Sequence, residues 1–222
     1  MTEDTLVRGY RDLARETPAR PRDVLLRTLD LVLSAVFLVA ALPAVAVIAL
    51  ALVATSGFPV LYRGERVGRG GHVFTMFKFR TLKRDAESRL GPYLGEELVR
   101  RTEEEFAPLG KWLKATQLDE IPQFINVLRG DMSLVGPRPI RPVFFAELAR
   151  DLPAYWQRLV VRPGLTGLAQ VRRGYETSMA EKLAHDLEWI ADRSVRLYLR
   201  TVFATGWRVL KQSLRGLASH RA

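Results

Sequence analysis

Two adjacent carboxylates, Asp119 and Glu120, stand in the segment ATQLDEIPQF at residues 115–124. Pro122 follows the pair, and proline is tolerated only in the first turn of a helix, where its missing N–H is not needed. The helix that the next residues predict must therefore begin near Leu118 or Asp119. This start places both carboxylates at the amino-terminal, positive end of the helix dipole.

An acidic pair at this place has a structural reading and a chemical one. Aspartate is a favoured N-cap, and an acid in the first turn complements the helix dipole, so the pair could simply stabilise the helix. The same backbone donors also keep a carboxylate ionised and attract phosphate. An ionised carboxylate beside a bound phosphate is either a nucleophile on phosphorus or a ligand for a hard cation such as Mg²⁺.

Apolar spacing extends this helix to residue 129, and Gly130 is a fitting stop. Four apolar residues recur at the i, i+3, i+4 and i+7 positions and predict a buried stripe: Ile121, Phe124, Ile125 and Leu128. The two carboxylates are therefore expected off the buried stripe.

Lys78 and Arg80 are candidate phosphate ligands on a predicted β-hairpin. Strand-like residues 60–67 and 73–80 flank the turn sequence GRGGH. Because side chains along a strand alternate between its faces, Lys78 and Arg80 are expected on the same face. Two cations on one face could clamp a phosphate, although a merely solvated cationic face has the same pattern.

Arg138 is a third candidate phosphate ligand, in the segment GPRP. Pro137 and Pro139 fix the backbone on either side of it, and a long cation on a stiffened backbone loses less freedom when it binds an anion. Arginine also suits bidentate phosphate binding. The alternative is an ordinary surface turn.

The composition points to an anionic partner. The 222 residues carry a formal net charge of +10, which favours nucleic acid, an acidic membrane surface or a phosphorylated substrate. The absence of cysteine excludes disulfides and thiolate zinc sites. The histidines are scattered, which argues against a histidine-rich metal site: His72, His185 and His220.

Residues 31–62 form an apolar run without a charged side chain. Such a run is long enough to cross a membrane as a helix, which needs about 20 residues. A secretory signal peptide is one alternative, but its apolar part usually has about 7–15 residues, and this run is longer and starts well inside the chain. An ordinary spanning helix and a helix that enters and returns on the same side are the other two readings.

Two features favour a return to the same side. Pro43 lies near the middle of the run and kinks a helix, which leaves arms of about a dozen residues, roughly 18 Å each and too short to cross alone. Lysine and arginine mark the cytoplasmic side of a membrane, and they flank both ends of the run. The flanking cations are Arg8, Arg11, Arg15, Arg20, Arg22 and Arg27 before it, and Arg63, Arg66, Arg69, Lys78, Arg80, Lys83 and Arg84 after it.

The remaining segments predict connecting elements and helices. Residues 1–20 predict a polar lead with a short surface helix, and the charge-rich residues 83–107 predict a solvated connector. Gly164 and Gly167, in a loop before a short strand, could let the backbone approach a ligand.

Two helices are predicted towards the end of the chain, and the second is basic and amphipathic. Such a helix can lie in a membrane interface or pack on the domain core. Its apolar residues are Phe203, Trp207, Leu210 and Leu214, and its basic ones are Arg200, Arg208, Lys211 and Arg215.

Four segments together resemble the bacterial sugar transferases, the monotopic phosphoglycosyl transferases that act on polyprenol phosphate. They are RTLDLVLS, GFPVLYRGERVGRGGHVFTMFKFRTL, LDEIPQFINVLRGDMSLVGPRP and VRPGLTGLAQV, which occur in the family's order. The resemblance covers residues 27 to about 210, which is nearly the whole chain. The four segments match a short member of the family. Longer members carry an additional N-terminal membrane domain, for which this sequence is expected to leave no room.

The resemblance implies a two-step reaction. Asp119 and Glu120 match the family's catalytic acidic pair, whose aspartate attacks the β-phosphate of a nucleoside diphosphate sugar, usually a UDP-sugar. A phosphosugar–enzyme ester forms and the nucleoside monophosphate leaves. Polyprenol phosphate then takes the phosphosugar and leaves as polyprenol diphosphate sugar.

The resemblance also implies how the site is charged. Mg²⁺ assists the reaction, Lys78 and Arg138 match phosphate-binding residues, and Arg80 shares the strand face of Lys78. Glu120 is expected to help hold the metal or shape the site, and whether Asp119 or Glu120 holds Mg²⁺ more closely stays open.

The sequence departs from the family pattern in two places. Leu42 precedes the membrane proline, where the family often has a serine that can bond the carbonyl freed by proline. Before the acids, Lys114 replaces an arginine and Gln117 a serine. Lysine keeps the charge but loses the planar fork, so Lys114 is not assigned to the site.

The sequence thus predicts an α+β protein with a small, helix-rich cytoplasmic catalytic domain that contains a short β-hairpin. A proline-kinked re-entrant membrane helix and interfacial amphipathic helices are expected to anchor it. The expected parts are a polar lead at residues 1–26, the re-entrant helix at 27–57 and the phosphoglycosyl transferase domain at 58–222. The expected location is the bacterial inner membrane, with the catalytic domain facing the cytoplasm.

The expected partners are a nucleotide sugar, polyprenol phosphate and membrane lipids, without nucleic acid, and a homodimer is left open. One alternative is a single-span membrane protein whose basic domain binds nucleic acid or anionic lipid without catalysis. Another is an enzyme of the same kind that works through a ternary complex, with Asp119 only a metal ligand. The sequence does not identify the sugar.

Overall fold

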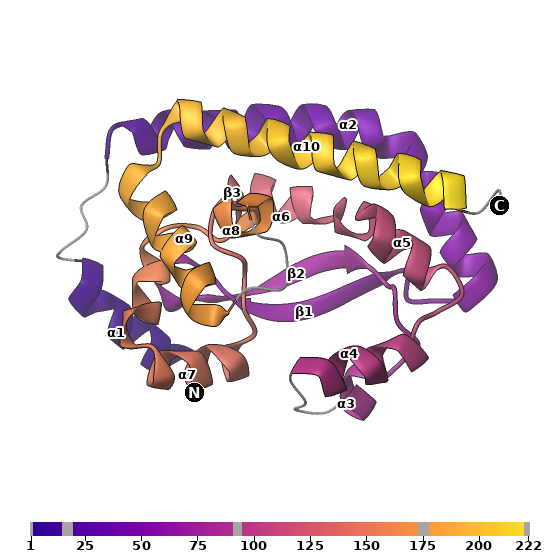
Figure 1. The fold of residues 1–222 in the computed structure, drawn as a ribbon, viewed down its shortest axis with the longest axis horizontal. Helices are drawn as coiled ribbons and strands as arrows, with labels where there is room; N and C mark the ends of the chain where they lie inside the picture. The colour runs from indigo at the N-terminus through magenta and orange to yellow at the C-terminus, as the bar shows by residue number, and fades with distance from the viewer. Residues whose placement is uncertain (1, 15–19, 91–94, 173–177, 220–222) are drawn as a thin grey trace.

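The computed structural model of the chain describes residues 2–14, 20–90, 95–172 and 178–219. Helices make up most of it, and Figure 1 shows the two longest, α2 and α10, running side by side over the rest of the protein. The helices are α1 Glu3–Ala14, α2 Arg22–Ser56, α3 Ala86–Leu90, α4 Gly95–Glu104, α5 Gly110–Thr116, α6 Gln123–Arg129, α7 Pro142–Asp151, α8 Leu168–Arg172, α9 Met179–Asp192 and α10 Val195–Ser219. Three 3₁₀ helices, η1 Arg69–Gly71, η2 Leu118–Glu120 and η3 Pro153–Val160, and four strands, β1 Leu61–Val67, β2 Val73–Phe79, β3 Ser133–Val135 and β4 Gly164–Thr166, complete it.

Strands β1 and β2 form the predicted hairpin. They pair antiparallel over their full length, and η1 closes the turn. Gly70 and Gly71 have φ of 74° and 79°, a left-handed backbone that glycine adopts without strain. The hairpin prediction is confirmed, although β2 ends at Phe79 rather than at Arg80.

The second sheet pairs β3 with β4 in parallel, a pairing that no sequence pattern predicted. A Cβ added to Gly164 would lie 2.1 Å from the backbone nitrogen of Gly136, and one added to Gly167 would lie 2.4 Å from its carbonyl oxygen. These two glycines therefore make room for the backbone of Gly136, whereas the sequence predicted that they make room for a ligand. Helix α8, and not a strand, follows.

Helix α2 is a single 35-residue helix with Pro43 inside it. It is long and apolar enough to cross a membrane, and only 11% of an apolar 18-residue stretch of it is buried within the protein. Large apolar side chains along it are exposed, among them Val36, Val39 and Leu50. An apolar surface of this size is characteristic of a membrane or partner interface. Figure 1 shows that α2 changes direction along its length.

Both ends of α2 are tied to the same body of the protein. At its start, Asp23 accepts two hydrogen bonds from Arg193 at 2.7 and 2.9 Å. At its end, Arg80 donates to the carbonyl oxygens of Ser56 and Gly57 at 2.6 and 2.8 Å. The first and last turns therefore lie against one domain.

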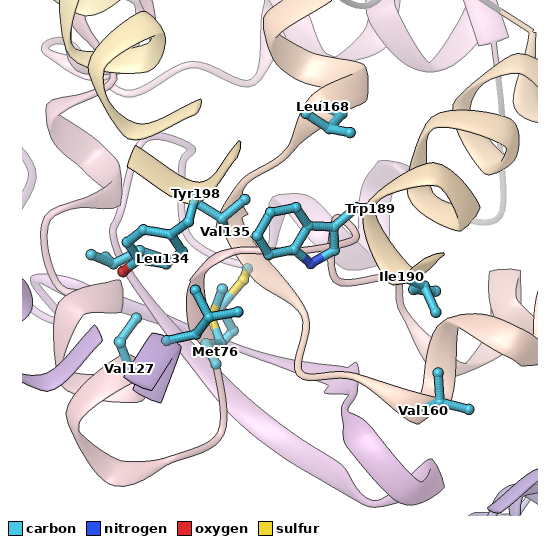
Figure 2. Packing of buried hydrophobic residues seen from close by; sticks show 11 residues of the cluster. Met76, Val127, Leu134, Val135, Val160, Leu168, Trp189, Ile190 and Tyr198 are labelled. Atoms are coloured by element: carbon cyan, nitrogen blue, oxygen red, sulfur yellow. The ribbon is translucent and has the colours of Figure 1, made fainter. Parts of the chain in front are cut away.

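The largest core cluster joins α9 and α10 to the two sheets. Trp189 and Tyr198 pack with Leu134, Val135 and Met76, and Figure 2 shows these side chains around strand β3. A second cluster forms around three buried residues, Leu6, Phe145 and Tyr155. Leu6 belongs to α1, so the helix predicted in the polar lead exists and contributes to the core.

Helix α6 buries a different face from the one that the apolar spacing predicted. Its buried residues are Gln123, Asn126 and Val127, whereas the predicted stripe, Ile121, Phe124, Ile125 and Leu128, is only partly buried. Asn126 explains the difference. Its side chain accepts from the backbone N–H of Phe77 and donates to the carbonyl of Thr75, which turns this polar face towards β2.

The last two helices are confirmed as α9 and α10. Helix α10 packs against α5 and β3, and Arg208 donates to the backbone carbonyls of Gln170 and Val171. Phe203, Trp207 and Leu210 are nonetheless exposed. Packing on the domain is therefore confirmed for one face of the helix, and the placement of its exposed apolar side chains in a membrane interface stays a prediction. Leu214 and Arg215 lie beyond the side chains that the structure describes.

Candidate active site

The acidic pair lies on η2, between α5 and α6. Helix α5 ends because Gln117 adopts a left-handed backbone with φ of 58°, and α6 starts after Pro122, which occupies the N-cap position. The turn begins at Leu118 as proline placement predicted, but it is a 3₁₀ turn followed by a separate helix. Neither start carries a side-chain cap hydrogen bond, so the carboxylates are not used as helix caps.

Strand β2 brings Lys78 to this pair from 42 residues away in sequence. Nζ of Lys78 lies 2.6 Å from Oε1 of Glu120 and 3.9 Å from Oδ2 of Asp119. Asn126 fastens α6 to the same strand just before Lys78. Sequence reasoning missed Asn126, which the structure buries fully. Its only signal in the sequence was an amide placed between the apolar residues Ile125 and Val127.

Arg138 lies near the same oxygen of Glu120, with Nη2 3.7 Å from Oε1. Its backbone carbonyl accepts a hydrogen bond of 2.8 Å from the buried Arg158. Arg158 also pairs with Asp186 at 2.8 Å and donates to the hydroxyl of Tyr155 at 2.7 Å. Arg158 therefore fixes the loop that carries Arg138, and no local feature of the sequence indicated it.

Arg80 does not join this group, contrary to the prediction that it shares a face with Lys78. Its guanidinium donates to the carbonyls of Ser56 and Gly57 at the end of α2. The last carbonyls of a helix lack partners within the helix, and a guanidinium satisfies them well. Strand β2 ends one residue earlier, so strict strand alternation does not govern Arg80.

Lys114, which replaces the family's arginine, also points elsewhere. Its Nζ lies 5.1 Å from the centre of the Phe106 ring, within the range of a cation–π contact. The described geometry thus brings together Asp119, Glu120, Lys78 and Arg138.

The two carboxylates differ in their affinity for a proton. Asp119 is 7% exposed, and burial, opposed by Lys78 and reinforced by Glu120, raises its pKa to about 6. For Glu120, burial also acts to raise the pKa, but Lys78 and Arg138 outweigh it and hold the pKa below its usual value. Near neutral pH both groups are ionised, and Asp119 is the more basic of the two.

The acidic pair can supply only part of the ligand set of Mg²⁺. Within the described residues no cluster of three or more His, Cys, Asp or Glu side chains forms. Magnesium in phosphoryl-transfer sites is commonly held by one or two carboxylates together with substrate phosphates and water. Asp119 and Glu120 fit this donor set.

Comparisons with known proteins agree with the resemblance seen in the motifs. The family described as bacterial sugar transferase matches residues 21–212. The chain is 38% identical over 189 residues to a UDP-glucose:undecaprenyl-phosphate glucose-1-phosphate transferase of Caulobacter vibrioides, covering 81% of this chain and 69% of the relative.

Two other relatives act on different sugars by their names. A UDP-N-acetylgalactosamine-undecaprenyl-phosphate N-acetylgalactosaminephosphotransferase of Aeromonas hydrophila is 37% identical over 150 residues, 66% of this chain and 34% of the relative. An undecaprenyl-phosphate galactose phosphotransferase of Salmonella typhimurium is 31% identical over 220 residues, 95% of this chain and 44% of the relative. The chain thus spans less than half of these two relatives. Since the family match covers most of the chain, the protein belongs to the bacterial sugar transferase family.

Proposed function

We propose that the protein transfers a sugar 1-phosphate from a UDP-sugar to polyprenol phosphate, through a phosphosugar held covalently on Asp119. The observation that carries the proposal is the unequal use of the acidic pair. Nζ of Lys78 makes a short contact of 2.6 Å with Oε1 of Glu120, whereas it lies 3.9 Å from Oδ2 of Asp119, and Nη2 of Arg138 lies 3.7 Å from Oε1 of Glu120. An ionised oxygen without a strong hydrogen bond from a cation is the better nucleophile of the two.

In the first step, a carboxylate oxygen of Asp119 attacks the β-phosphorus of the donor. A bond forms between that oxygen and phosphorus, and the bond from the β-phosphorus to the oxygen that bridges to the α-phosphate breaks. The electron pair leaves with UMP. The product on the enzyme is a mixed anhydride between the aspartyl carboxyl group and the sugar phosphate.

In the second step, an oxygen of polyprenol phosphate attacks the same phosphorus. The bond between phosphorus and the aspartyl oxygen breaks, and its electron pair restores the carboxylate. Polyprenol diphosphate sugar leaves. No net proton is required at Asp119 over the cycle, so an ionised resting carboxylate suits the role.

Glu120, Lys78 and Arg138 are proposed to bind and orient the phosphates. Nζ of Lys78 lies within reach of both carboxylates, so it can shift towards a non-bridging phosphate oxygen without leaving the site. Arg138 approaches from a loop that Arg158 holds in place. Positioned cations stabilise the charge that develops on transferring phosphoryl oxygens, and removal of one such group commonly costs about 10²–10³ in rate.

Mg²⁺ is the proposed cofactor, held by Asp119 and Glu120 together with the donor diphosphate. When bound, it neutralises phosphate charge and so makes attack by an anionic carboxylate less unfavourable. The fit of a two-carboxylate donor set supports this assignment.

We further propose that α2 enters the cytoplasmic leaflet and returns to the same side. The polar contacts at both of its ends support this arrangement. Asp23 pairs with Arg193 at the start, and Arg80 binds the carbonyls of Ser56 and Gly57 at the end. A helix that crossed the bilayer would place these ends on opposite sides, and one domain could not bind both. Cations on both flanks favour the cytoplasmic side.

A UMP-release assay tests the reaction. Purified protein with Mg²⁺ and polyprenol phosphate is incubated with a panel of UDP-sugars, which also identifies the donor, because the relatives' names include three different sugars. UMP release with one donor supports the proposal, and none with any donor contradicts it.

The ternary-complex alternative makes a different prediction in the absence of acceptor. A covalent route exchanges labelled UMP into the UDP-sugar without polyprenol phosphate, because the first step is reversible. A ternary complex gives no exchange until the acceptor is present.

A further inference from the structure

A second group of cations surrounds a cavity near the start of α2. The cavity encloses about 60 Å³, several times the roughly 10–15 Å³ that one water needs. Four arginines line it together with Asp23 and Asp30: Arg27, Arg69, Arg162 and Arg193. None of the four charged residues of the candidate active site lines this cavity.

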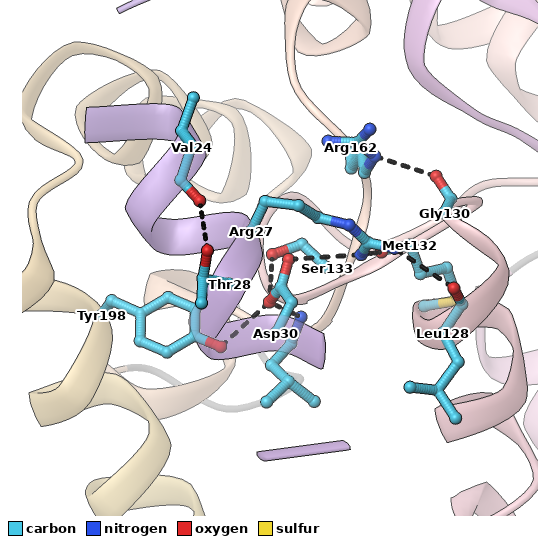
Figure 3. Close-up of polar contacts among 11 residues, drawn as sticks. Val24, Arg27, Thr28, Asp30, Leu128, Gly130, Met132, Ser133, Arg162 and Tyr198 are labelled. Carbon is cyan, nitrogen blue, oxygen red and sulfur yellow. Dashed lines mark hydrogen bonds and ion pairs between the residues drawn. The ribbon is translucent and has the colours of Figure 1, made fainter. Parts of the chain in front are cut away.

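The two aspartates of the cavity already have partners. Asp23 accepts two hydrogen bonds from Arg193 and a third from the backbone N–H of Arg20. Asp30, which is buried, accepts from the hydroxyls of Ser133 and Tyr198 and from the backbone N–H of Leu134 at 2.8–2.9 Å. Figure 3 shows this arrangement around Asp30. Four arginines against two aspartates leave the lining with an excess of positive charge.

The arginines differ in how far the protein uses their donors. Both terminal nitrogens of Arg27 donate to the carbonyls of Leu128 and Met132 at 3.3 Å. Arg162 donates only through Nε, to the carbonyl of Gly130 at 2.9 Å (Figure 3). Among the described residues, the terminal nitrogens of Arg162 and the side chain of Arg69 make no hydrogen bond. Their fork donors are therefore available to a ligand.

Capping of a helix end explains only part of this cluster. The carbonyls of Leu128 and Gly130 lie at the end of α6, where cations are favourable, and Arg27 and Nε of Arg162 satisfy them. Capping uses neither the terminal nitrogens of Arg162 nor Arg69. Burial, followed by repulsion from Arg27 and Arg69, lowers the pKa of Arg162, so the fold holds these cations together at a cost that a bound anion would offset.

The position of the cavity indicates where its anion comes from. The α2 residues that line it, from Asp23 to Asp30, directly precede the uncharged run at residues 31–62. Val24 and Leu25, in the same turns, are 72% and 51% exposed and point away from the protein. If α2 enters a leaflet, these turns lie at the depth of the lipid headgroups, which flank a hydrocarbon core about 30 Å thick.

We propose that this cavity binds the phosphate group of an anionic membrane lipid through Arg162 and Arg69, at a site separate from the acidic pair. Arginine forks match phosphate oxygens in a bidentate manner. The choice of a lipid rather than a free phosphate rests on the proposed insertion of α2. The site would fix the depth of the start of α2, at the end of α6 opposite to the one beside Asp119 and Glu120.

The test measures the melting temperature of the full chain in a nonionic detergent at fixed ionic strength. Dihexanoyl phosphatidylglycerol is added as the anionic lipid, dihexanoyl phosphatidylcholine as the neutral lipid and inorganic phosphate as the free anion. Phosphatidylglycerol is expected to raise the melting temperature by a few degrees, because it binds only the folded state. The other two additives are expected to give much smaller shifts.

Two variants locate the effect. Arg69→Gln removes a side chain without a hydrogen bond in the described protein, so it should fold normally, and it should weaken the apparent lipid affinity about tenfold. Arg162→Gln should weaken it at least as much. Arg63→Gln, an exposed arginine at the far end of the same hairpin, removes the same charge and should leave the shift unchanged.

Several outcomes would overturn the assignment. If phosphatidylglycerol raises the melting temperature of Arg69→Gln as much as that of the unmodified protein, the lipid does not bind in this cavity. An equal shift with inorganic phosphate would make this a site for a free anion. Asp119→Asn separates the two proposals, because it should abolish turnover and retain the lipid shift, so failure of the catalytic proposal leaves this test intact.

Discussion

Nζ of Lys78 lies 2.6 Å from Oε1 of Glu120 but 3.9 Å from Oδ2 of Asp119. Lys78 therefore pairs with Glu120 and makes only a long contact with the carboxylate of Asp119. Arg138 also lies nearer to Glu120. In the proposed reaction, this asymmetry assigns different roles to two adjacent carboxylates: Glu120 pairs with the cations and Asp119 is the nucleophile.

Asp119→Asn is expected to reduce turnover at least about a thousandfold, because it removes the attacking oxygen of the covalent route. The fold should survive, since the carboxylate caps no helix and the amide has the same shape. UMP release and the melting temperature measure the two effects.

Glu120→Gln is the matched control for that variant, because it makes the same change one residue away. It should weaken binding or slow the reaction, yet retain exchange of labelled UMP into the donor. If Glu120→Gln abolishes exchange and Asp119→Asn retains it, the assigned roles are reversed.

The pH dependence of kcat/KM should follow ionisation of Asp119. Its pKa is raised to about 6, so activity at limiting donor should rise with pH through a midpoint near 6 and level off above it. Glu120, whose pKa is lowered, stays ionised over this range. Mg²⁺ held by the pair should move the midpoint lower as its concentration rises. A midpoint near the ordinary value of 3.8 at low Mg²⁺ would contradict the effect of burial.

The raised pKa of Asp119 also predicts that stability falls with rising pH, whereas activity rises. A carboxyl whose pKa is about 6 in the folded protein and about 4 in the unfolded chain binds its proton more tightly when folded. Its contribution to the free energy of unfolding therefore falls as pH rises from about 4 to about 6 and stays reduced above that. Asp119→Asn should remove this loss, so its melting temperature relative to the unmodified protein should increase between pH 4.5 and pH 7.

Lys78→Met should raise the pKa of Asp119 further, because Lys78 lowers it in the intact site. The midpoint of the pH profile should move above 6, and the maximal rate should fall about 10²–10³-fold through loss of a phosphate-binding cation. Arg63→Met, on the paired strand and exposed, is the control. An unchanged midpoint in Lys78→Met would mean that the lysine does not control ionisation of the pair.

Arg158→Met should destabilise the protein by about 3–5 kcal/mol, because it leaves the buried carboxylate of Asp186 without its partner. It should also raise the KM for the donor, since the carbonyl of Arg138 loses its hydrogen bond. Urea unfolding and donor kinetics measure the two effects.

The double variant Arg158→Met with Asp186→Leu separates stability from positioning. Replacing both partners of a buried ion pair with apolar groups is often nearly neutral, so stability should largely return. The KM should stay raised, because Arg138 remains unsupported. Full recovery of KM would reduce Arg158 to a structural role.

The two flanks of α2 can be labelled individually, because the chain has no cysteine of its own. Asp4→Cys and Arg63→Cys are both exposed, one before and one after the helix. A membrane-impermeant maleimide should label both in inverted inner-membrane vesicles and neither in spheroplasts. Labelling of the two positions from opposite sides would establish a crossing helix in place of the proposed return.

Local signals predicted the hairpin and the position of the acidic pair. The GRGGH turn and Pro122 act through backbone geometry within a few residues, so their consequences can be read from the sequence. The apposition of Lys78 and Glu120 required the packing of η2 on β2, which spacing alone does not give.

The errors of the sequence reading arose where a tertiary contact overrode a local rule. Arg80 was expected to follow the alternation of the strand, but β2 ends at Phe79, and the guanidinium of Arg80 binds the carbonyls at the end of α2 instead. The apolar stripe of α6 is only partly buried because Asn126 binds the edge of β2 with the opposite face. Arg158 acts on Arg138 across the fold, and a lone arginine in the sequence carries no sign of such a contact.

The most direct test of the central claim is the mass of the enzyme after incubation with donor and Mg²⁺ in the absence of polyprenol phosphate. A covalent route through Asp119 predicts a gain equal to one phosphosugar, located on the peptide that contains Asp119. This gain should be absent from Asp119→Asn and lost when the acceptor is added. An enzyme that releases UMP only with acceptor present, and never gains this mass, would contradict it.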